Sequence, residues 1–168
     1  MKFKKLSDIC CFRKGKVNVA ELIPITYIST ENMLPNKGGV TVASSLPTTV
    51  LTQEYKKGDV LISNIRPYFK KIWQATQNGG CSNDVLVLSA NDHINSEFLY
   101  YVLADDAFFS YSMATSKGTK MPRGDKVAIM NYAVPDFNEA TQTKIASLLR
   151  ALDDKIKLNN AINNNLAA

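Results

Sequence analysis

Hydrophobic residues recur at helical spacing over the last 30 residues of the chain. From Glu139 to Leu166 there is neither proline nor glycine, and the stripe advances in alternating steps of four and three residues. The stripe consists of Ile145, Leu149, Leu152, Ile156, Asn159, Asn163 and Leu166. Leu148 flanks it and is included with the residues expected to contact the partner. This heptad pattern predicts one long helix that packs against a partner, and the two asparagines are expected to fix its register at some cost in stability.

Short apolar runs separated by turn residues precede this helix and predict a β-rich domain. Strands are expected at 23–29, 40–42, 49–51, 60–63, 71–75, 85–88 and 132–135, with turns at 57–59 and 78–80 and a short helical turn at 6–10. Ser96 is expected to cap a helix that runs to Ala104, a second helix follows at 105–114, and Asn138 is expected to cap the long helix. This order predicts an α+β fold, with one globular domain at 1–136 and a helical arm at 137–168.

The net charge of +5 is unevenly distributed. Residues 1–75 contain 12 Lys or Arg and 5 Asp or Glu, a net charge of +7. Residues 113–135 contain 4 Lys or Arg and 1 Asp, a net charge of +3. Residues 76–112 carry a net −5, and residues 136–168 are neutral. A basic excess on loop-rich segments suits a polyanion, with nucleic acid as the leading candidate, and it equally suits a solubilising surface.

No catalytic motif accompanies this basicity. The chain lacks a Gly-rich phosphate loop and a Gly-x-Ser-x-Gly elbow, and its three cysteines and single histidine give no metal spacing. Asp59 and Asp84 form at most a weak nuclease pair, because no Glu-x-Lys follows them. No apolar run is long enough for a membrane span, and free cysteines suit the reducing cytoplasm. We expect a cytoplasmic, non-catalytic protein without metal; a small DNA methyltransferase or nuclease, or an interaction module that binds no DNA, is the alternative.

Two segments carry residue types that contact DNA in other proteins, namely basic and hydroxyl side chains on loops. In the first segment, Gly118 would allow the backbone to approach DNA closely. The candidates in this segment are Lys117, Gly118, Thr119, Lys120 and Arg123. The second follows the expected strand at 60–63, and its candidates are Arg66, Tyr68, Lys70 and Lys71. For Arg66 a structural ion pair is nearly as good an interpretation, and a solvated surface is the alternative for each single basic residue.

Several stretches, in their order and spacing, resemble the motifs of one family. They lie at 58–67 (GDVLISNIRP), 81–88, 98–103 and 118–119, and the most specific match is Val134-Pro135 followed by 142–149 and 152–156. The chain therefore resembles the specificity subunit of type I restriction–modification enzymes over nearly its whole length. Family members usually contain two target recognition domains and two long helices, whereas this chain contains one of each.

The resemblance implies a role in DNA recognition. In the family, the recognition domain reads half of a split DNA target, and the helix sets the distance to the other half and docks adenine-methyltransferase subunits. By analogy with the family's early recognition loop, a third set of DNA-contact candidates is Tyr27, Ser29, Thr30 and Asn32. No cofactor is expected in this chain, since S-adenosylmethionine belongs to the methyltransferase partner. A restriction or translocase subunit is a further candidate partner.

A chain with one recognition domain can complete the family's helix pair only with a second copy of itself. We therefore predict an antiparallel homodimer that reads an inverted repeat. A helix of 28 residues is about 42 Å long, more than one DNA turn of about 34 Å. The alternative is that the apolar stripe packs on the chain's own domain.

Overall fold

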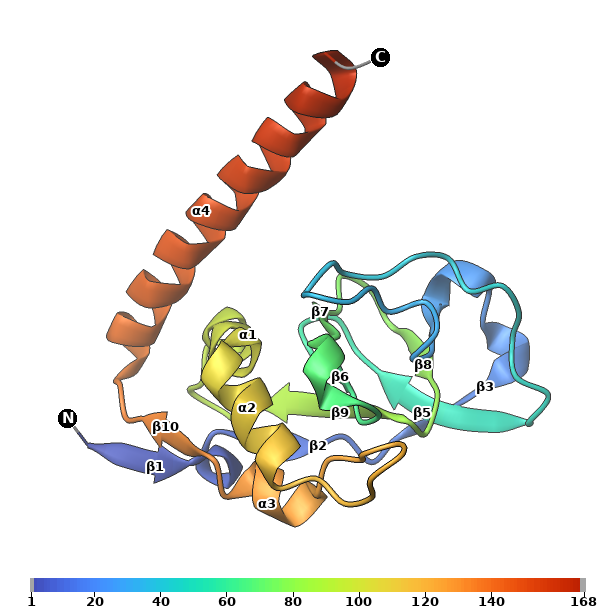
Figure 1. Cartoon of the computed structure of the whole chain (residues 1–168), viewed down its shortest axis with the longest axis horizontal. Helices are drawn as coiled ribbons and strands as arrows, with labels where there is room; N and C mark the ends of the chain where they lie inside the picture. Colours follow the sequence, from blue (N-terminus) through green and yellow to red (C-terminus); the bar gives the residue numbers. More distant parts are fainter. Residues whose placement is uncertain (1, 167–168) are drawn as a thin grey trace.

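The computed structural model describes residues 2–166, with side chains through Asn165. It is a mixed α+β domain with a long C-terminal helix, which confirms the expected fold class (Figure 1). The strands are β1 (Phe3–Lys5), β2 (Cys10–Phe12), β3 (Lys16–Asn18), β4 (Tyr27–Ile28), β5 (Leu51–Tyr55), β6 (Val60–Ser63), β7 (Ile72–Gln74), β8 (Gly79–Cys81), β9 (Val85–Ala90) and β10 (Ala133–Pro135). The helices are α1 (Ser96–Ala104), α2 (Asp106–Ala114), α3 (Lys126–Met130) and α4 (Glu139–Leu166). Among the residues described, no helix has the length and hydrophobicity that a membrane span requires.

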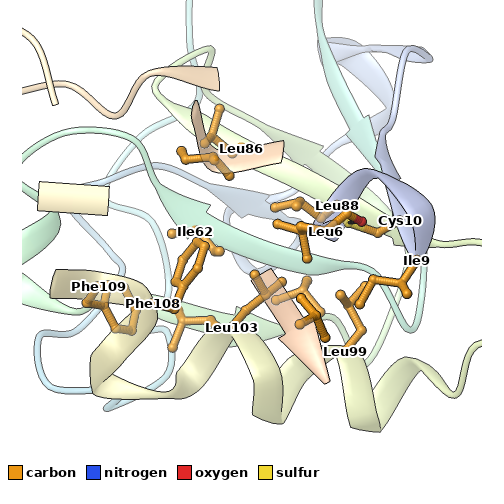
Figure 2. Close-up of a cluster of buried hydrophobic side chains, with 14 residues drawn as sticks. Leu6, Ile9, Cys10, Ile62, Leu86, Leu88, Leu99, Leu103, Phe108 and Phe109 are labelled. Atoms are coloured by element: carbon orange, nitrogen blue, oxygen red, sulfur yellow. Dashed lines mark hydrogen bonds between the residues drawn. The ribbon is translucent and has the colours of Figure 1, made fainter. Parts of the chain in front are cut away.

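Four antiparallel strands in the order β2-β9-β6-β7 form the central sheet. Successive side chains of a strand point to opposite faces, and here both faces are buried. On β6, Val60 and Ile62 join one hydrophobic cluster, whereas Leu61 joins another. In the first cluster, side chains of the sheet meet α1 through Leu99 and α2 through Phe108 (Figure 2). Burial on both faces explains why 60–62 and 85–88 are continuous apolar runs.

A second sheet has the strand order β3-β5-β8-β4, with β4 and β8 parallel. The sequence predicted a turn at 78–80, and this was wrong because Gly79 begins strand β8. A Cβ atom at Gly79 would lie 2.2 Å from the Thr26 carbonyl oxygen and 2.5 Å from Tyr55 Oη. Glycine is therefore needed here for close packing against the backbone rather than for a turn.

A two-stranded sheet of β1 and β10 joins the beginning of the chain to the base of α4. Val134, on β10, is fully buried in the first hydrophobic cluster. The Asp136 amide donates to the Lys2 carbonyl over 2.9 Å, and Lys4 Nζ lies 2.9 Å from Asp136 Oδ1. The start of the arm is thereby fixed to the domain.

Several local expectations are confirmed. Leu6–Asp8 forms a 3-10 helix, and 60–63, 85–88, α2 and α4 lie where the pattern placed them. The amide of Thr141 donates to Asn138 Oδ1 over 2.9 Å, so Asn138 caps α4. At α1 the capping prediction was wrong by one residue, because Asn95 Oδ1 accepts from the Phe98 amide over 2.9 Å and Ser96 is the first helical residue.

Three strand predictions in the first third of the chain were wrong, and the one at 49–51 was wrong in its bounds because the strand there is β5, Leu51–Tyr55. At 23–29 the chain forms a 3-10 helix, Pro24–Thr26, followed by the two-residue β4. Proline presets the φ angle for the first helical position and cannot donate to a sheet, which explains the difference. At 40–42 there is only an isolated bridge between Met33 and Val40.

The turn at 57–59 is confirmed, and it explains the Gly-Asp part of the family motif. Gly58 has a φ of 92°, a conformation that favours glycine. The buried carboxylate of Asp59 accepts the Lys56 amide over 2.8 Å and is held by Arg13, whose Nη2 lies 2.8 Å from Asp59 Oδ1. Ser89 Oγ lies 3.0 Å from the same Nη2 atom. This motif is therefore structural, and Asp59 is not available as half of a nuclease pair.

Candidate nucleic-acid interface

A basic hairpin forms the first predicted DNA-contact segment. The backbones of Lys117 and Arg123 exchange two N–H···O bonds of 2.9 Å, and Gly118 bends the chain with a φ of 90°. Thr119 and Lys120 are exposed near its tip. We call residues 117–123 the basic hairpin.

The Lys117 side chain is partly committed within the protein. Its Nζ lies 2.5 Å from Asp125 Oδ2, and this hydrogen bond holds the pKa of that carboxyl below its usual range. Asp125 Oδ1 also accepts the amides of Val127 and Ala128, which caps α3. The lysine stays largely exposed, with 80% of its side chain accessible, so it can still contribute charge at the surface.

The basic hairpin docks on the segment that contains the second predicted set. The Arg66 amide donates to the Pro122 carbonyl over 2.8 Å, and the Gly124 amide donates to the Asn64 carbonyl over 3.1 Å. A Cβ at Gly124 would lie 2.9 Å from Asn64 Oδ1, so a larger residue would push these segments apart. Two segments joined by residues nearly sixty positions apart in the sequence therefore form one surface, which the sequence had not predicted.

The second set lies on the turn at 66–71, which we call the strained turn. Arg66 and Lys70 both have a φ of 51°, and they flank the 3-10 helix Pro67–Phe69. Non-glycine residues in this conformation cost free energy and are enriched at functional sites. Tyr68 is exposed and packs on Phe69, with 4.7 Å between ring centroids. Among the residues described, the Arg66 side chain has no ion-pair partner, so the structure does not support the structural ion pair.

The two lysines of this turn make internal contacts. Lys70 Nζ lies 2.9 Å from Asp106 Oδ2, and Lys37 Nζ lies 2.8 Å from Asp106 Oδ1. Hydrogen bonds from Lys37 and then Lys70 lower the pKa of this exposed carboxyl to about 2. Lys71 Nζ donates to the Thr30 carbonyl over 2.5 Å and lies 5.7 Å from the centroid of the Phe69 ring. The lysines link the strained turn to the loops at 30 and 37.

A polar cavity of about 480 Å³ contains the third predicted set. Its lining includes Tyr27, Ser29, Thr30, Glu31, Asn32, Ser82 and Asp84. Asn32 is 5% exposed, and its amide donates to the carbonyls of Tyr27 and Thr41, over 3.0 and 2.8 Å. Tyr27 is also buried, and burial raises the pKa of its hydroxyl. Direct DNA contact by Asn32 and Tyr27 does not fit this burial, whereas Ser29 and Thr30 are partly accessible.

Asp84 connects the cavity with the basic hairpin. Its Oδ1 lies 3.2 Å from Arg123 Nη2, and it also lines the cavity. The sequence offers Asp84 only as half of a weak nuclease pair. No local pattern could reveal the contact, since the partners are 39 positions apart and meet only in the fold. Within the described part of the chain, no group of three or more His, Cys, Asp or Glu could hold a metal ion.

The first half of α4 packs on the domain that precedes it, mainly against α1. Gln142 is buried, accepting the Asn95 amide over 3.0 Å and donating to the Phe137 carbonyl over 2.8 Å. The Tyr101 hydroxyl donates to Asp153 Oδ2 over 2.9 Å. Residues 154–165 are all exposed, and Figure 1 shows this end of α4 projecting beyond the domain.

The apolar stripe of α4 divides into two parts. Ile145 and Leu149 are half-buried on the domain side, as the alternative of packing within the chain predicted. Leu152, Ile156, Asn159 and Asn163 are exposed, whereas the side chain of Leu166 lies outside the described residues. The exposed apolar side chains of α4, which we call the arm stripe, are Leu148, Leu152, Ile156, Leu158 and Ile162.

The fold and the sequence together define a DNA specificity domain. The family model described as "type I restriction modification DNA specificity domain" matches residues 1–168. The chain belongs to this family, which confirms the resemblance found in the sequence.

Relatives of known function agree with this assignment. The specificity subunit of the type I restriction enzyme HindI from Haemophilus influenzae is 31% identical over 153 residues, covering 84% of this chain and 33% of that protein. The EcoDI specificity subunit of Escherichia coli is 24% identical over 135 residues, which cover 80% of this chain and 30% of that protein. The chain spans about a third of the length of these curated relatives.

Solved structures share the fold. The HsdS subunit from Thermoanaerobacter tengcongensis superposes with a TM-score of 0.71 at 18% identity, over 96% of this chain and 44% of that one. The S subunit of a type I system from M. genitalium gives a TM-score of 0.64 at 16% identity, over 93% and 40%. The long C-terminal helix is thus part of a known architecture.

Proposed function

We propose that this chain is a non-catalytic specificity subunit that reads one half of a bipartite DNA target, pairs through α4 with a second copy, and docks adenine-methyltransferase subunits. The observation that carries the proposal is the arm stripe, which lies on a helix that continues beyond the domain. The family to which the chain belongs supports the DNA part of the proposal.

The arm stripe supports pairing between copies. Its five leucine and isoleucine side chains are between 47% and 64% exposed. Large apolar side chains gathered on one helix are costly in water and mark a surface that packs against a partner. The hydrogen bonds of Gln142 and Asp153 occupy a different face of α4, so pairing does not require the helix to leave its domain.

The arm length supports a bipartite target. The centre of the stretch 148–166 lies about eleven residues beyond the centre of 139–153, the part of α4 that contacts the domain. An antiparallel pair centred there holds the two domains about 30 Å apart, at about 1.5 Å per residue. This is close to one DNA turn of about 34 Å, the usual spacing of half-sites read from one side of the duplex. The distance is shorter than the full helix suggested, because the first half of α4 lies on the domain.

The DNA surface would consist of the basic hairpin and the strained turn, with Ser29 and Thr30 at its edge. Lys120 and Arg66 are exposed, and no ion pair holds them among the residues described, so they are suited to phosphate contacts. In this proposal the chain needs no cofactor, and S-adenosylmethionine belongs to the methyltransferase partner.

Selection from a pool of randomised DNA duplexes tests this function. The 168-residue chain is expected to enrich an inverted repeat with a constant spacer at low salt. The double variant Leu152→Glu, Ile156→Glu is expected to lose the constant spacing while it keeps any half-site preference. Lys157→Glu, also exposed on α4 but outside the arm stripe, is the matched control and should select the same repeat as the wild type. Enrichment of no sequence at all would contradict the proposal.

A further inference from the structure

We infer that Arg123 is a guanine-reading side chain of this domain and that Asp84 is the positioning residue that holds it for that role. The inference rests on the proposed DNA recognition and adds to it the base that is read. It starts from the ion pair between Arg123 Nη2 and Asp84 Oδ1, 3.2 Å apart at the edge of the polar cavity.

The backbones of both partners are fixed before any DNA binds. Arg123 exchanges two 2.9 Å hydrogen bonds with Lys117 and forms a bridge with Ile65. The carbonyl of Asp84 accepts the Asn64 amide over 2.8 Å, and its own amide lies 3.3 Å from Ser82 Oγ. Holding an arginine in one orientation lowers the entropy lost when it binds a base, and this favours selective contacts.

The guanidinium remains available for a ligand. The Arg123 side chain is 54% exposed, and its contact with Asp84 uses one nitrogen of a group that carries five N–H donors in a planar fork. Guanine presents O6 and N7 as adjacent acceptors in the major groove, and a bidentate arginine matches this pair. No other base pair presents two acceptors in that arrangement, so a fixed arginine at this surface selects guanine.

Base reading by Arg123 also explains why a carboxylate lies at this surface. Asp84 lies beside the basic hairpin, where a carboxylate repels the phosphates of a duplex. A surface for non-specific phosphate contact alone would gain nothing from this charge. The carboxylate is useful if it orients an arginine toward a base edge, because charge-assisted hydrogen bonds fix direction as well as energy.

The neighbouring lysine and arginine side chains do not share this arrangement. Lys117 is paired with Asp125, which caps α3, and Lys71 donates to a backbone carbonyl. Lys120 and Arg66 are exposed without an ion pair among the residues described, so neither has a fixed orientation. Arg123 combines half-exposure, a fixed backbone and an acid that orients its side chain.

The test begins with the duplex motif selected by the wild-type chain. Replacing the guanine that Arg123 reads by 7-deazaguanine removes N7, and we expect wild-type affinity to fall about 10-fold. Arg123→Ala should lose preference at that one position and show no further loss with 7-deazaguanine. Arg123→Lys should keep phosphate attraction but not the bidentate contact, so its discrimination should also fall.

Asp84→Asn gives a readout that a purely structural role would not change. The variant keeps the size of the side chain but loses its charge, so non-specific affinity for the polyanion should rise while guanine discrimination falls several-fold. Thermal unfolding of each variant checks that the domain is folded. Lys120→Ala in the same hairpin is the matched control, with uniformly weaker binding and an unchanged motif.

The outcomes separate the inference from the proposed function. A wild-type chain that selects no motif overturns both. A wild-type motif that is kept by Arg123→Ala, with only uniform weakening like that of Lys120→Ala, overturns the guanine assignment and leaves the proposed function intact. If the affinity is unchanged with 7-deazaguanine at every guanine of the motif, the guanine assignment is likewise overturned and the proposed function is not affected.

Discussion

At the residue scale, the charges of this domain are divided between internal ion pairs and open surface. Asp106 lies at the start of α2 and binds two lysines, Lys37 and Lys70, that belong to separate loops. Arg13 and Asp59 similarly join β2 to the turn before β6. Arg66 and Lys120 remain exposed, so they are the simplest candidates for phosphate contact. Residue type alone could not separate these roles, because each depends on a partner that is distant in the sequence.

The Asp106 pairing has a measurable pH dependence. Its pKa in the folded chain, about 2, lies below the ordinary value of 3.8, so the pairing stabilises the fold above about pH 4 and this contribution is lost as pH falls toward 2. Carbon-13 NMR titration of the carboxyl should show the low midpoint. The double variant Lys37→Ala, Lys70→Ala should raise it toward 3.8. An unchanged midpoint in that variant would show that the lysines are not the cause.

The basic hairpin predicts a salt effect. Replacing Lys117, Lys120 and Arg123 together by Ala should weaken DNA binding and flatten the plot of log affinity against log salt. Each lost phosphate contact reduces the slope by about 0.9, so the loss of Lys117 and Lys120 should change it by about 1 to 2. Fluorescence anisotropy over a range of salt concentrations measures this slope. Lys144→Ala, at an exposed position of α4, is the control; equal slopes for wild type and triple variant would remove the hairpin from the interface.

At the element scale, local signals fixed much of the fold. The absence of Pro and Gly predicted α4 from end to end, and continuous apolar runs predicted the strands at 60–63 and 85–88. Expectations failed where tertiary contact decides the conformation, as at Gly79, where neighbouring atoms rather than a turn require glycine. The candidate site shows the same division. Its basic segments could be predicted from composition, whereas the docking of the hairpin on Asn64 and the role of Asp84 could not, because both are long-range contacts.

Strand β8 offers a stability prediction. Gly79→Ala should destabilise the domain by about 1–3 kcal/mol, the usual cost of forcing extra atoms into a packed site. The Cβ would meet the Thr26 backbone, which cannot move without distorting the second sheet. Gly15→Ala is the matched control, since the three atoms nearest to its Cβ would all belong to the flexible side chain of Glu54. Urea unfolding measures both, and equal stabilities of the two variants would contradict this account of β8.

At the scale of the whole molecule, a recognition domain carries an arm that is fixed at one end and exposed at the other. The fixed half lets α4 transmit the orientation of the domain, because Gln142, Arg150 and Asp153 bind it to the segment that contains α1. The exposed half carries the arm stripe. The chain covers 44% of the T. tengcongensis subunit that it resembles in fold. In the proposed assembly, two copies would together supply two recognition domains and a helix pair.

Light scattering coupled to size-exclusion chromatography tests this central claim most directly. At micromolar concentrations the wild-type chain should have twice the 18.6 kDa mass of one copy, and Leu152→Glu, Ile156→Glu should return it to a single mass while the domain stays folded. A wild-type chain that remains at 18.6 kDa as its concentration rises would contradict pairing through α4.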